Sequence, residues 1–300
     1  MTRSMQVFQV DAFTRTRFTG NPAGVVLDAD QLSDAEMLAV ARELNNADTA
    51  FVLAADGDDH DLRVRFFTPR TESSFVGHAT VATHYVLSRD GRPRHAIRQR
   101  QKSGIVTVDV RGTDAARQIA IRQPAPPLGR ELNDRERMAV LDALALSSAD
   151  LDSRCPLRIA GSSSTRLLVG VRGPDQLKQL KPDFARLTTL SAQLGASGFF
   201  VFTLAPKVAD VQIESRMFCP ALGIPEDPVS GNAHGLLGAY LVANQLLPHD
   251  NHSVRFVGAQ GHYLKRAGRV EIELKLVDGK LDSVLIIGQA EIVFETTLTL

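Results

Sequence analysis

The chain has 300 residues, with 34 Lys plus Arg against 34 Asp plus Glu and a formal net charge of zero. This balance leaves no broad electrostatic field that would attract nucleic acid or an anionic membrane surface. No stretch approaches the ~20 apolar residues of a membrane span, and the N-terminal residues lack a signal-peptide pattern. The two cysteines are too few for a disulfide framework, and no His/Cys spacing is typical of a metal site. We therefore expect a cytoplasmic protein without a metal, of a length that suits two domains.

The first half of the chain reads as strand-rich with two helices. Ser33 and Glu36 form a capping-box pattern, which predicts a helix over 34–44, and a small apolar run predicts a second helix over 77–87. Alternating apolar residues predict strands at 6–10, 25–27, 49–53, 63–67, 96–99, 105–110 and 119–122. The proline-rich stretch 123–128 is the best linker candidate, because prolines stiffen an extended segment.

The second half repeats this mixture of strands and helices. Helices are predicted at 135–144, 174–180 and 185–194, and a further helix opens at Ser230-Gly231-Asn232. Strands are predicted at 157–160, 167–171, 199–204, 253–257, 270–276, 283–288 and 290–294. Glu226, Asp227 and Pro228 are predicted to form a turn before the last of these helices. The helix 236–242 is apolar nearly all round, so we expect it to be buried on every side.

Two copies of one pattern organise the chain. Each copy has an Arg-x-Phe-x-Pro corner, at 65–69 and at 216–220, followed by a helix that begins Gly-polar-Ala, at 77–79 and at 231–233. We infer an α+β fold of two pseudo-symmetric domains, 1–123 (to which the strand 290–300 could belong) and 124–289. Each is pictured as a curved antiparallel sheet or barrel wrapped around a central helix, with a cleft between the domains.

Chemistry is expected where the two helix starts converge, because the first N–H groups of a helix lack intrahelical partners and attract anions. Asp48, His78 and Asp227 are the candidates to give or take protons. His78 could also be an ordinary first-turn residue, and Asp227 an ordinary turn carboxylate. Asp48 aligns with about Ser197 in the second copy, so its carboxylate breaks the internal symmetry and suggests a single proton-handling side.

Four runs in this order resemble the PhzF-like isomerase family of phenazine biosynthesis. They are Asp11-Ala12-Phe13 with 20–25, Ala41-Arg42-Glu43-Leu44 with 48–52, Arg65 to Thr80, and Arg216 to Gly235. The resemblance implies a diaminopimelate-epimerase type of fold, a homodimer, and isomerisation by proton transfer without metal or organic cofactor. It places the family acid at Asp48, the family histidine at His78, and the family aspartate and small polar helix-start residue at Asp227 and Asn232.

Two positions depart from these families. The acid before Thr49-Ala50-Phe51 is usually Glu and here is Asp48, one methylene shorter. Related racemases place a Cys just before each helix start, where this chain has Val76 and Ser230. A two-thiol racemase is therefore excluded.

The leading hypothesis is a cofactor-independent isomerase that moves a proton on a small metabolite, expected to be cyclic and to bear a carboxylate. Asp48, His78 and Asp227 would be catalytic, with a protonated His78 helping to keep Asp48 ionised. The substrate would be bound by Asn21, Gly77, Ser230, Gly231 and Asn232. The rival hypothesis is a weakly catalytic or non-catalytic small-molecule binder that keeps the cleft.

Overall fold

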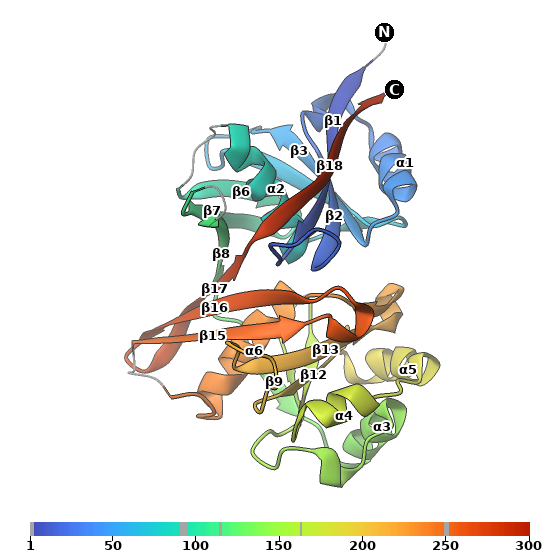
Figure 1. Cartoon of the computed structure of the whole chain (residues 1–300), viewed down its shortest axis with the longest axis vertical. Coiled ribbons are helices and arrows are strands. Elements are labelled where there is room, and N and C mark those ends of the chain that lie inside the picture. Colours follow the sequence, from blue (N-terminus) through green and yellow to red (C-terminus); the bar gives the residue numbers. More distant parts are fainter. Residues whose placement is uncertain (1–2, 91–94, 114–115, 163, 249–251) are drawn as a thin grey trace. The chain divides into compact units, whose positions relative to one another are not determined.

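The computed structural model describes residues 3–90, 95–113, 116–162, 164–248 and 252–300 (Figure 1). The fold is mixed α/β. The chain divides into two compact units, Met1–Gln123 with Ile287–Leu300 (unit 1) and Pro124–Ile286 (unit 2). The chain thus leaves unit 1 once and returns to it for the last strand. Within the described ranges, no helix has the length and apolar character needed to cross a bilayer.

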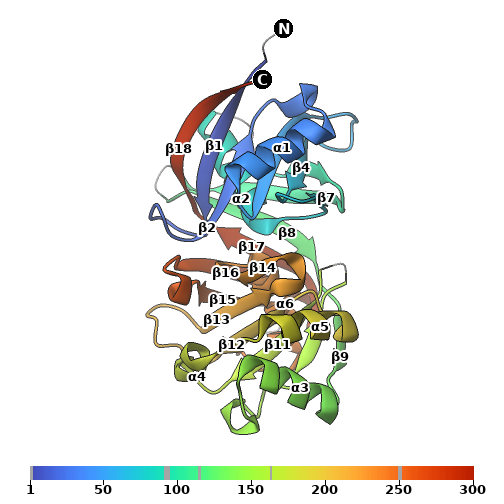
Figure 2. The same ribbon diagram turned by 90° about the vertical axis from the view of Figure 1, so that its right-hand side faces the viewer.

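The described residues of unit 1 form two α-helices, α1 (Asp34–Leu44) and α2 (Gly77–Leu87), whose bounds agree with those predicted. Its strands are β1 (Ser4–Ala12), β2 (Asn21–Val26), β3 (Asp48–Ala54), β4 (Leu62–Phe67), β5 (Glu72–Ser73), β6 (Ile97–Gln101), β7 (Gly104–Arg111), β8 (Gln118–Pro124) and β18 (Ala290–Thr299). Strand β1 pairs antiparallel with both β2 and β18, and Figure 2 shows β1 and β18 side by side.

The two helices of unit 1 are buried to different degrees because their sequences differ. Helix α1 begins at a complete Ser33–Glu36 capping box and buries one face, including Met37 and Val40, against Phe51 and Phe67. Helix α2 consists mainly of small and apolar residues, and all of its residues except Tyr85 are buried. Because it is buried on nearly every side, α2 forms the centre of unit 1.

In the part of unit 2 that the structure describes there are four α-helices, α3 (Asp134–Leu144), α4 (Pro174–Gln179), α5 (Phe184–Leu194) and α6 (Gly231–Ala243). Its strands are β9 (Leu128–Glu131), β10 (Arg158–Ala160), β11 (Arg166–Val171), β12 (Phe199–Thr203), β13 (Ile213–Cys219), β14 (Ile224–Asp227), β15 (Ser253–Gln260), β16 (Gly268–Val277) and β17 (Lys280–Gly288). The proline-rich stretch is thus shorter than the predicted linker, since β8 ends at Pro124 and β9 starts at Leu128.

Strand β12 shows how unit 2 fills both faces of its sheet. Phe199 and Val201 pack into the cluster that includes residues of α3, α4 and α5. The alternate residues turn to the other face, where Phe200 contacts His234 and Phe202 contacts Tyr240, both on α6. An unbroken apolar run suits a strand that is covered on both sides.

The strand pairing repeats between the units. In unit 1, β3 pairs parallel with β2 and antiparallel with β4, and β4 pairs antiparallel with β5 and parallel with β6. In unit 2, β12, β11, β13, β14 and β15 follow the same sequence of pairings. The expectation of antiparallel sheets therefore needs correction, since each unit also has two parallel pairings. In unit 1 these are joined by α1 and α2, because parallel neighbours require such crossover connections.

Two local expectations also need correction. Glu226 and Asp227 belong to strand β14 and not to a turn, because Asp227 pairs with Met217 and the Glu226 side chain is held by Arg216. The predicted loop at 20–24 becomes strand from Asn21, which pairs with Ala12 of β1. In both cases a partner distant in sequence decides the backbone conformation.

Candidate active site

Asp48 is the first residue of β3 and is only 7% exposed. Its Oδ1 accepts a hydrogen bond from the hydroxyl of Ser73, at 3.1 Å. Its Oδ2 lies 3.9 Å from Nε2 of His78, in the first turn of α2. Two polar side chains, from β5 and α2, thus lie beside the carboxylate at the start of β3.

His78 is a neutral imidazole in this setting. Burial lowers the pKa of His78 from 6.5 to about 4. Its Nε2 has no hydrogen-bond partner among the described residues. The expected protonated His78 is therefore wrong, because the side chain is too buried to hold a charge at neutral pH. A neutral ring beside a carboxylate leaves one buried nitrogen for a bound molecule.

The start of α2 has no side-chain cap, because Val76 occupies the N-cap position. Val76, Gly77 and His78 are all buried. A buried helix start without a cap leaves N–H donors that need an acceptor, and a bound anion can supply one. Gly77 therefore lies where a substrate oxygen would bind in unit 1.

The start of α6 in unit 2 is capped differently. Ser230 accepts from the backbone N–H of Ala233 at 3.3 Å, and its own N–H donates to Oε1 of Gln260. Gln260 also donates to the backbone carbonyl of Asp227, at 2.7 Å. Ser230 and Asp227 are thus tied to one glutamine, and Gly231 follows as the first residue of the helix. Asn232, half-buried, lies 3.4 Å from the carbonyl and the hydroxyl of Ser164.

Matching arginines support the two sites. Arg65 donates from Nε to Glu72 at 2.8 Å, and Arg216 donates from Nε to Glu226 at 2.9 Å. Each guanidinium also lies over the phenylalanine two residues later, at 5.1 and 5.0 Å from the ring centre. The Arg65 hydrogen bond lowers the pKa of Glu72. Glu72 and Glu226 therefore anchor β5 and β14 as paired carboxylates rather than as proton carriers.

The strand register identifies the true counterpart of Asp48. Phe51 pairs with Arg65 in unit 1, and Val201 pairs with Arg216 in unit 2. Counting back along both strands aligns Asp48 with Gly198, not with Ser197. A Cβ at Gly198 would lie 2.7 Å from the Met217 methyl carbon. Unit 2 therefore has no room for a second carboxylate at this position.

Three polar residues near these helix starts were not predicted from the sequence as site residues, namely Ser73, Ser164 and the side chain of Gln260. Their short polar side chains stand in loops or at strand ends, where such residues are common. The repeat offers a partial signal, because Gln260 aligns with Gln101 through the pairings of β13 with β15 and of β4 with β6.

Neither cysteine is suited to act as a base. Cys155 and Cys219 are both free and buried, and burial raises their pKa to about 11 and about 12 respectively. Val76 and Ser230 hold the two N-cap positions, as the sequence indicated. Among the described residues, no group of three or more His, Cys, Asp or Glu side chains is placed to hold a metal ion.

Residues 10–296 match the family described as phenazine biosynthesis-like protein (PhzC-PhzF). The chain therefore belongs to this family. An uncharacterized isomerase of Escherichia coli O157:H7, YddE, is 39% identical over 290 residues, which are 96% of each chain. A crystal structure of a PhzF-family phenazine biosynthesis protein from Bacillus anthracis superposes with a TM-score of 0.88, at 29% identity and with 99% of each chain covered.

The fold extends to more distant enzymes. A hydroxyproline epimerase from Agrobacterium vitis has a TM-score of 0.64 at 13% identity, covering 99% of this chain and 93% of that one. At this identity the likeness concerns the fold alone. Because the chain belongs to the PhzF-like family and its curated relatives are isomerases, it is an isomerase, as the motifs indicated.

Proposed function

We propose that this PhzF-like isomerase moves a proton between two positions of a small carboxylate-bearing metabolite, without a cofactor. The observation that carries the proposal is the cluster of Asp48, Ser73 and neutral His78 beside the uncapped start of α2. It combines a buried carboxylate with unused donors, which a proton-transfer reaction needs.

Asp48 is the proton carrier in this proposal. Its carboxylate removes a proton from one carbon of the substrate and becomes a carboxylic acid, while the substrate becomes an enolate-type anion. The acid exchanges its proton with solvent and then delivers one proton to a different atom, so no proton is gained or lost overall. Ser73 holds Oδ1, which leaves Oδ2 on the side of His78 to handle the proton.

The helix-start donors stabilise the anionic intermediate. N–H groups at Gly77 and the free nitrogen of His78 are fixed before the reaction begins, so they need no reorganisation when charge develops. Because His78 is neutral, it offers a hydrogen bond without competing for the proton that Asp48 carries. Asn21, the buried first residue of β2, is proposed to contact the substrate from the same unit.

Unit 2 is proposed to bind the substrate. Asp227, Ser230, Gly231 and Asn232 are the residues proposed for this role, with Asp227 as the second catalytic carboxylate. What supports this is the repeated pairing of the strands and the matching Arg65 and Arg216 anchors. We further propose a cytoplasmic homodimer, which sedimentation would test.

The test uses a panel of cyclic carboxylic acids. Melting temperature first identifies acids that stabilise the protein, since a ligand that binds only the folded state raises it. Each such acid is then incubated with the enzyme in deuterium oxide, and NMR follows exchange into the carbon skeleton. Wild type should catalyse exchange and isomerisation. Asp48→Asn should abolish both while leaving affinity within about tenfold, or ~1.4 kcal/mol. Full exchange by Asp48→Asn would remove Asp48 as the carrier, whereas no exchange by wild type with any acid that binds would favour a site that only binds.

A further inference from the structure

Unit 1 contains a polar cavity that the proposed isomerisation does not use. It has a volume of about 360 Å³ and is lined by Arg17, Tyr85, Arg89, Arg117, Glu291 and Ile292. We call it the arginine pocket. Cavities of this size hold small metabolites.

The arginine pocket lies apart from Asp48 and His78. Tyr85 is seven residues after His78 on α2, which is a rise of about 10 Å along the helix. Across the sheet, Asp48 pairs with Ala23, Ala23 with Val10 and Val10 with Ile292. Three strand spacings separate Asp48 from Ile292, or about 14 Å. A ligand in the arginine pocket therefore need not touch the proton-transfer cluster.

Positive charge predominates among the residues that line the arginine pocket. The lining includes three guanidinium groups and one carboxylate, that of Glu291. Arg117 is buried, with its guanidinium carbon 5.7 Å from the centre of the Tyr85 ring. Arg17 and Arg89 form no ion pair or hydrogen bond through their side chains with any described residue. Like charges gathered at one cavity repel each other, so an anion would stabilise the arrangement.

The pKa of Tyr85 is shifted by burial and by the same charged side chains that line the arginine pocket. Burial raises the pKa of its hydroxyl, the Glu291 carboxylate raises it further, and Arg117, Arg89 and Arg17 oppose the rise. The hydroxyl therefore stays protonated and can donate a hydrogen bond. Guanidinium groups bind carboxylate and phosphate oxygens in pairs, and a tyrosine hydroxyl complements them.

We infer that the arginine pocket is a second ligand site, which binds a small molecule carrying two or more carboxylate or phosphate groups. Arg17 and Arg89 take the outer anionic group and Arg117 the inner one. Glu291 accepts a hydrogen bond from a hydroxyl or ammonium group of the same ligand.

Calorimetric titration at low ionic strength tests this, with citrate as the carboxylate probe and inorganic pyrophosphate as the phosphate probe. Wild type should bind at least one of them, and the tighter probe identifies the preferred group. The double variant Arg17→Ala/Arg89→Ala should bind at least tenfold more weakly. Its fold should be unaffected, because both side chains are exposed and unpaired within the described chain. Glu291→Gln should bind several-fold more tightly, since it removes the one opposing charge.

Two matched variants locate the bound anion. Arg122→Ala removes one exposed arginine of unit 1 outside the pocket and should leave binding unchanged. Asp48→Asn should also leave it unchanged, whereas an anion bound beside Asp48 would bind more tightly once that carboxylate is gone. The inference is overturned if neither probe binds, if the double variant binds like wild type, or if Asp48→Asn alters binding as much as the arginine substitutions do.

Discussion

The Ser73 hydroxyl donates to Oδ1 of Asp48 across 3.1 Å and so joins β5 to the first residue of β3. This bond holds one carboxylate oxygen and leaves the other beside His78. The position of the proposed proton carrier is thus set by a residue 25 places further along the chain.

Ser73→Ala should lower kcat about tenfold with little change in KM, because a hydrogen bond to a charged group is worth about 1.5 kcal/mol. Steady-state kinetics on the substrate found by the anion panel measures it. Ser73→Thr should restore most of the rate, since it returns the hydroxyl. The neighbouring Ser74→Ala, at an exposed position, should behave like wild type. Equal kinetics for Ser73→Ala and Ser74→Ala would rule out a positioning role.

Asp48→Glu should keep or raise turnover. The extra methylene carries the carboxylate toward His78 Nε2, which lies 3.9 Å from Oδ2 in the wild type. It also restores the reach that the family resemblance implies. The kcat of this variant, compared with that of Asp48→Asn, measures the effect. If the Asp48→Glu variant were as inactive as the Asp48→Asn variant, the shorter acid would be required here.

Gly198→Ala should destabilise the protein by about 1–3 kcal/mol, because overpacked cores must shift. The added Cβ would meet the Met217 methyl carbon at 2.7 Å, Cys219 Sγ at 2.9 Å and the Phe218 carbonyl oxygen at 3.0 Å. Urea unfolding measures the loss. Gly235→Ala, in the same unit, is the control, because its Cβ would have its nearest neighbour at 3.4 Å. It should be neutral or stabilising, as helical Gly→Ala changes often are.

Stability should fall steeply between pH 6.5 and about pH 4. Burial lowers the pKa of His78, His84 and His234 from 6.5 to about 4. In this window the unfolded chain binds protons that the folded chain does not, so lowering the pH favours unfolding. Each histidine contributes a slope of up to about 1.4 kcal/mol per pH unit. Urea unfolding at several pH values measures the total.

His84→Gln isolates one of these contributions. The slope of stability against pH should fall by about one buried histidine, or ~1.4 kcal/mol per pH unit, whatever the overall loss of stability. His95→Gln, at an exposed position, is the control for replacing a histidine as such, and its stability at neutral pH should match wild type. An unchanged slope in His84→Gln would mean that His84 takes up its proton in the folded state.

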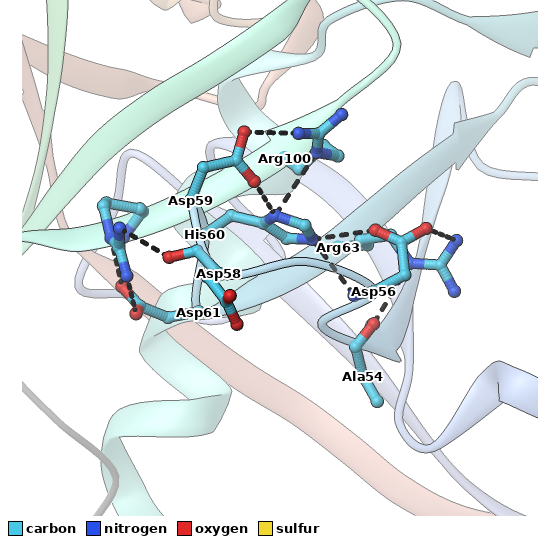
Figure 3. A network of polar contacts seen from close by, with 9 residues as sticks. Ala54, Asp56, Asp58, Asp59, His60, Asp61, Arg63 and Arg100 are labelled. Carbon is cyan, nitrogen blue, oxygen red and sulfur yellow. Dashed lines mark hydrogen bonds and ion pairs between the residues drawn. The ribbon is translucent and has the colours of Figure 1, made fainter.

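His60 holds together the loop between β3 and β4 (Figure 3). Its side chain is fully buried, with Nε2 3.0 Å from Asp56 and Nδ1 2.6 Å from Asp59. Arg63 and Arg100 pair with the same two carboxylates, at 2.8 and 2.5 Å. His60→Leu keeps the volume but removes both bonds, so we expect a clear drop in melting temperature, measured by calorimetry.

The nearby Arg98–Asp61 pair is the control for His60. Both of its side chains are more than two-fifths exposed, and such pairs add little to stability. Arg98→Ala should therefore leave the melting temperature nearly unchanged, and 0.5 M salt should shift the His60→Leu loss very little, because screening acts mainly on exposed charges. A larger loss in Arg98→Ala than in His60→Leu would contradict this.

The sequence predicted the helices well because their signals are local. Ser33 and Glu36 mark the start of α1, and the small apolar residues after Gly77 mark α2 as buried. The repeated Arg-x-Phe-x-Pro corners indicated the repeat itself, and the matching hydrogen bonds of Arg65 and Arg216 to Glu72 and Glu226 were seen only in the structure.

The features that could not be predicted from the sequence are those that depend on contacts between residues far apart in the chain. An alternation of apolar residues does not indicate which strands pair, so it could not predict the parallel pairing of β2 with β3. For the same reason it could not align Asp48 with Gly198, which required the strand register. The neutral state of His78 follows from burial by several elements at once. Ser73 became a site residue only when β5 placed its hydroxyl against Asp48.

Strand β18 gives the protein an order of assembly during synthesis. Unit 2 is one continuous stretch, Pro124–Ile286, whereas β1 must wait for β18 to cover its outer edge. Until the ribosome has made residues 290–299, the edge of β1 remains open, and open edges invite pairing with other chains. Unit 1, which contains Asp48 and His78, is therefore synthesised first but is the last unit to complete its sheet.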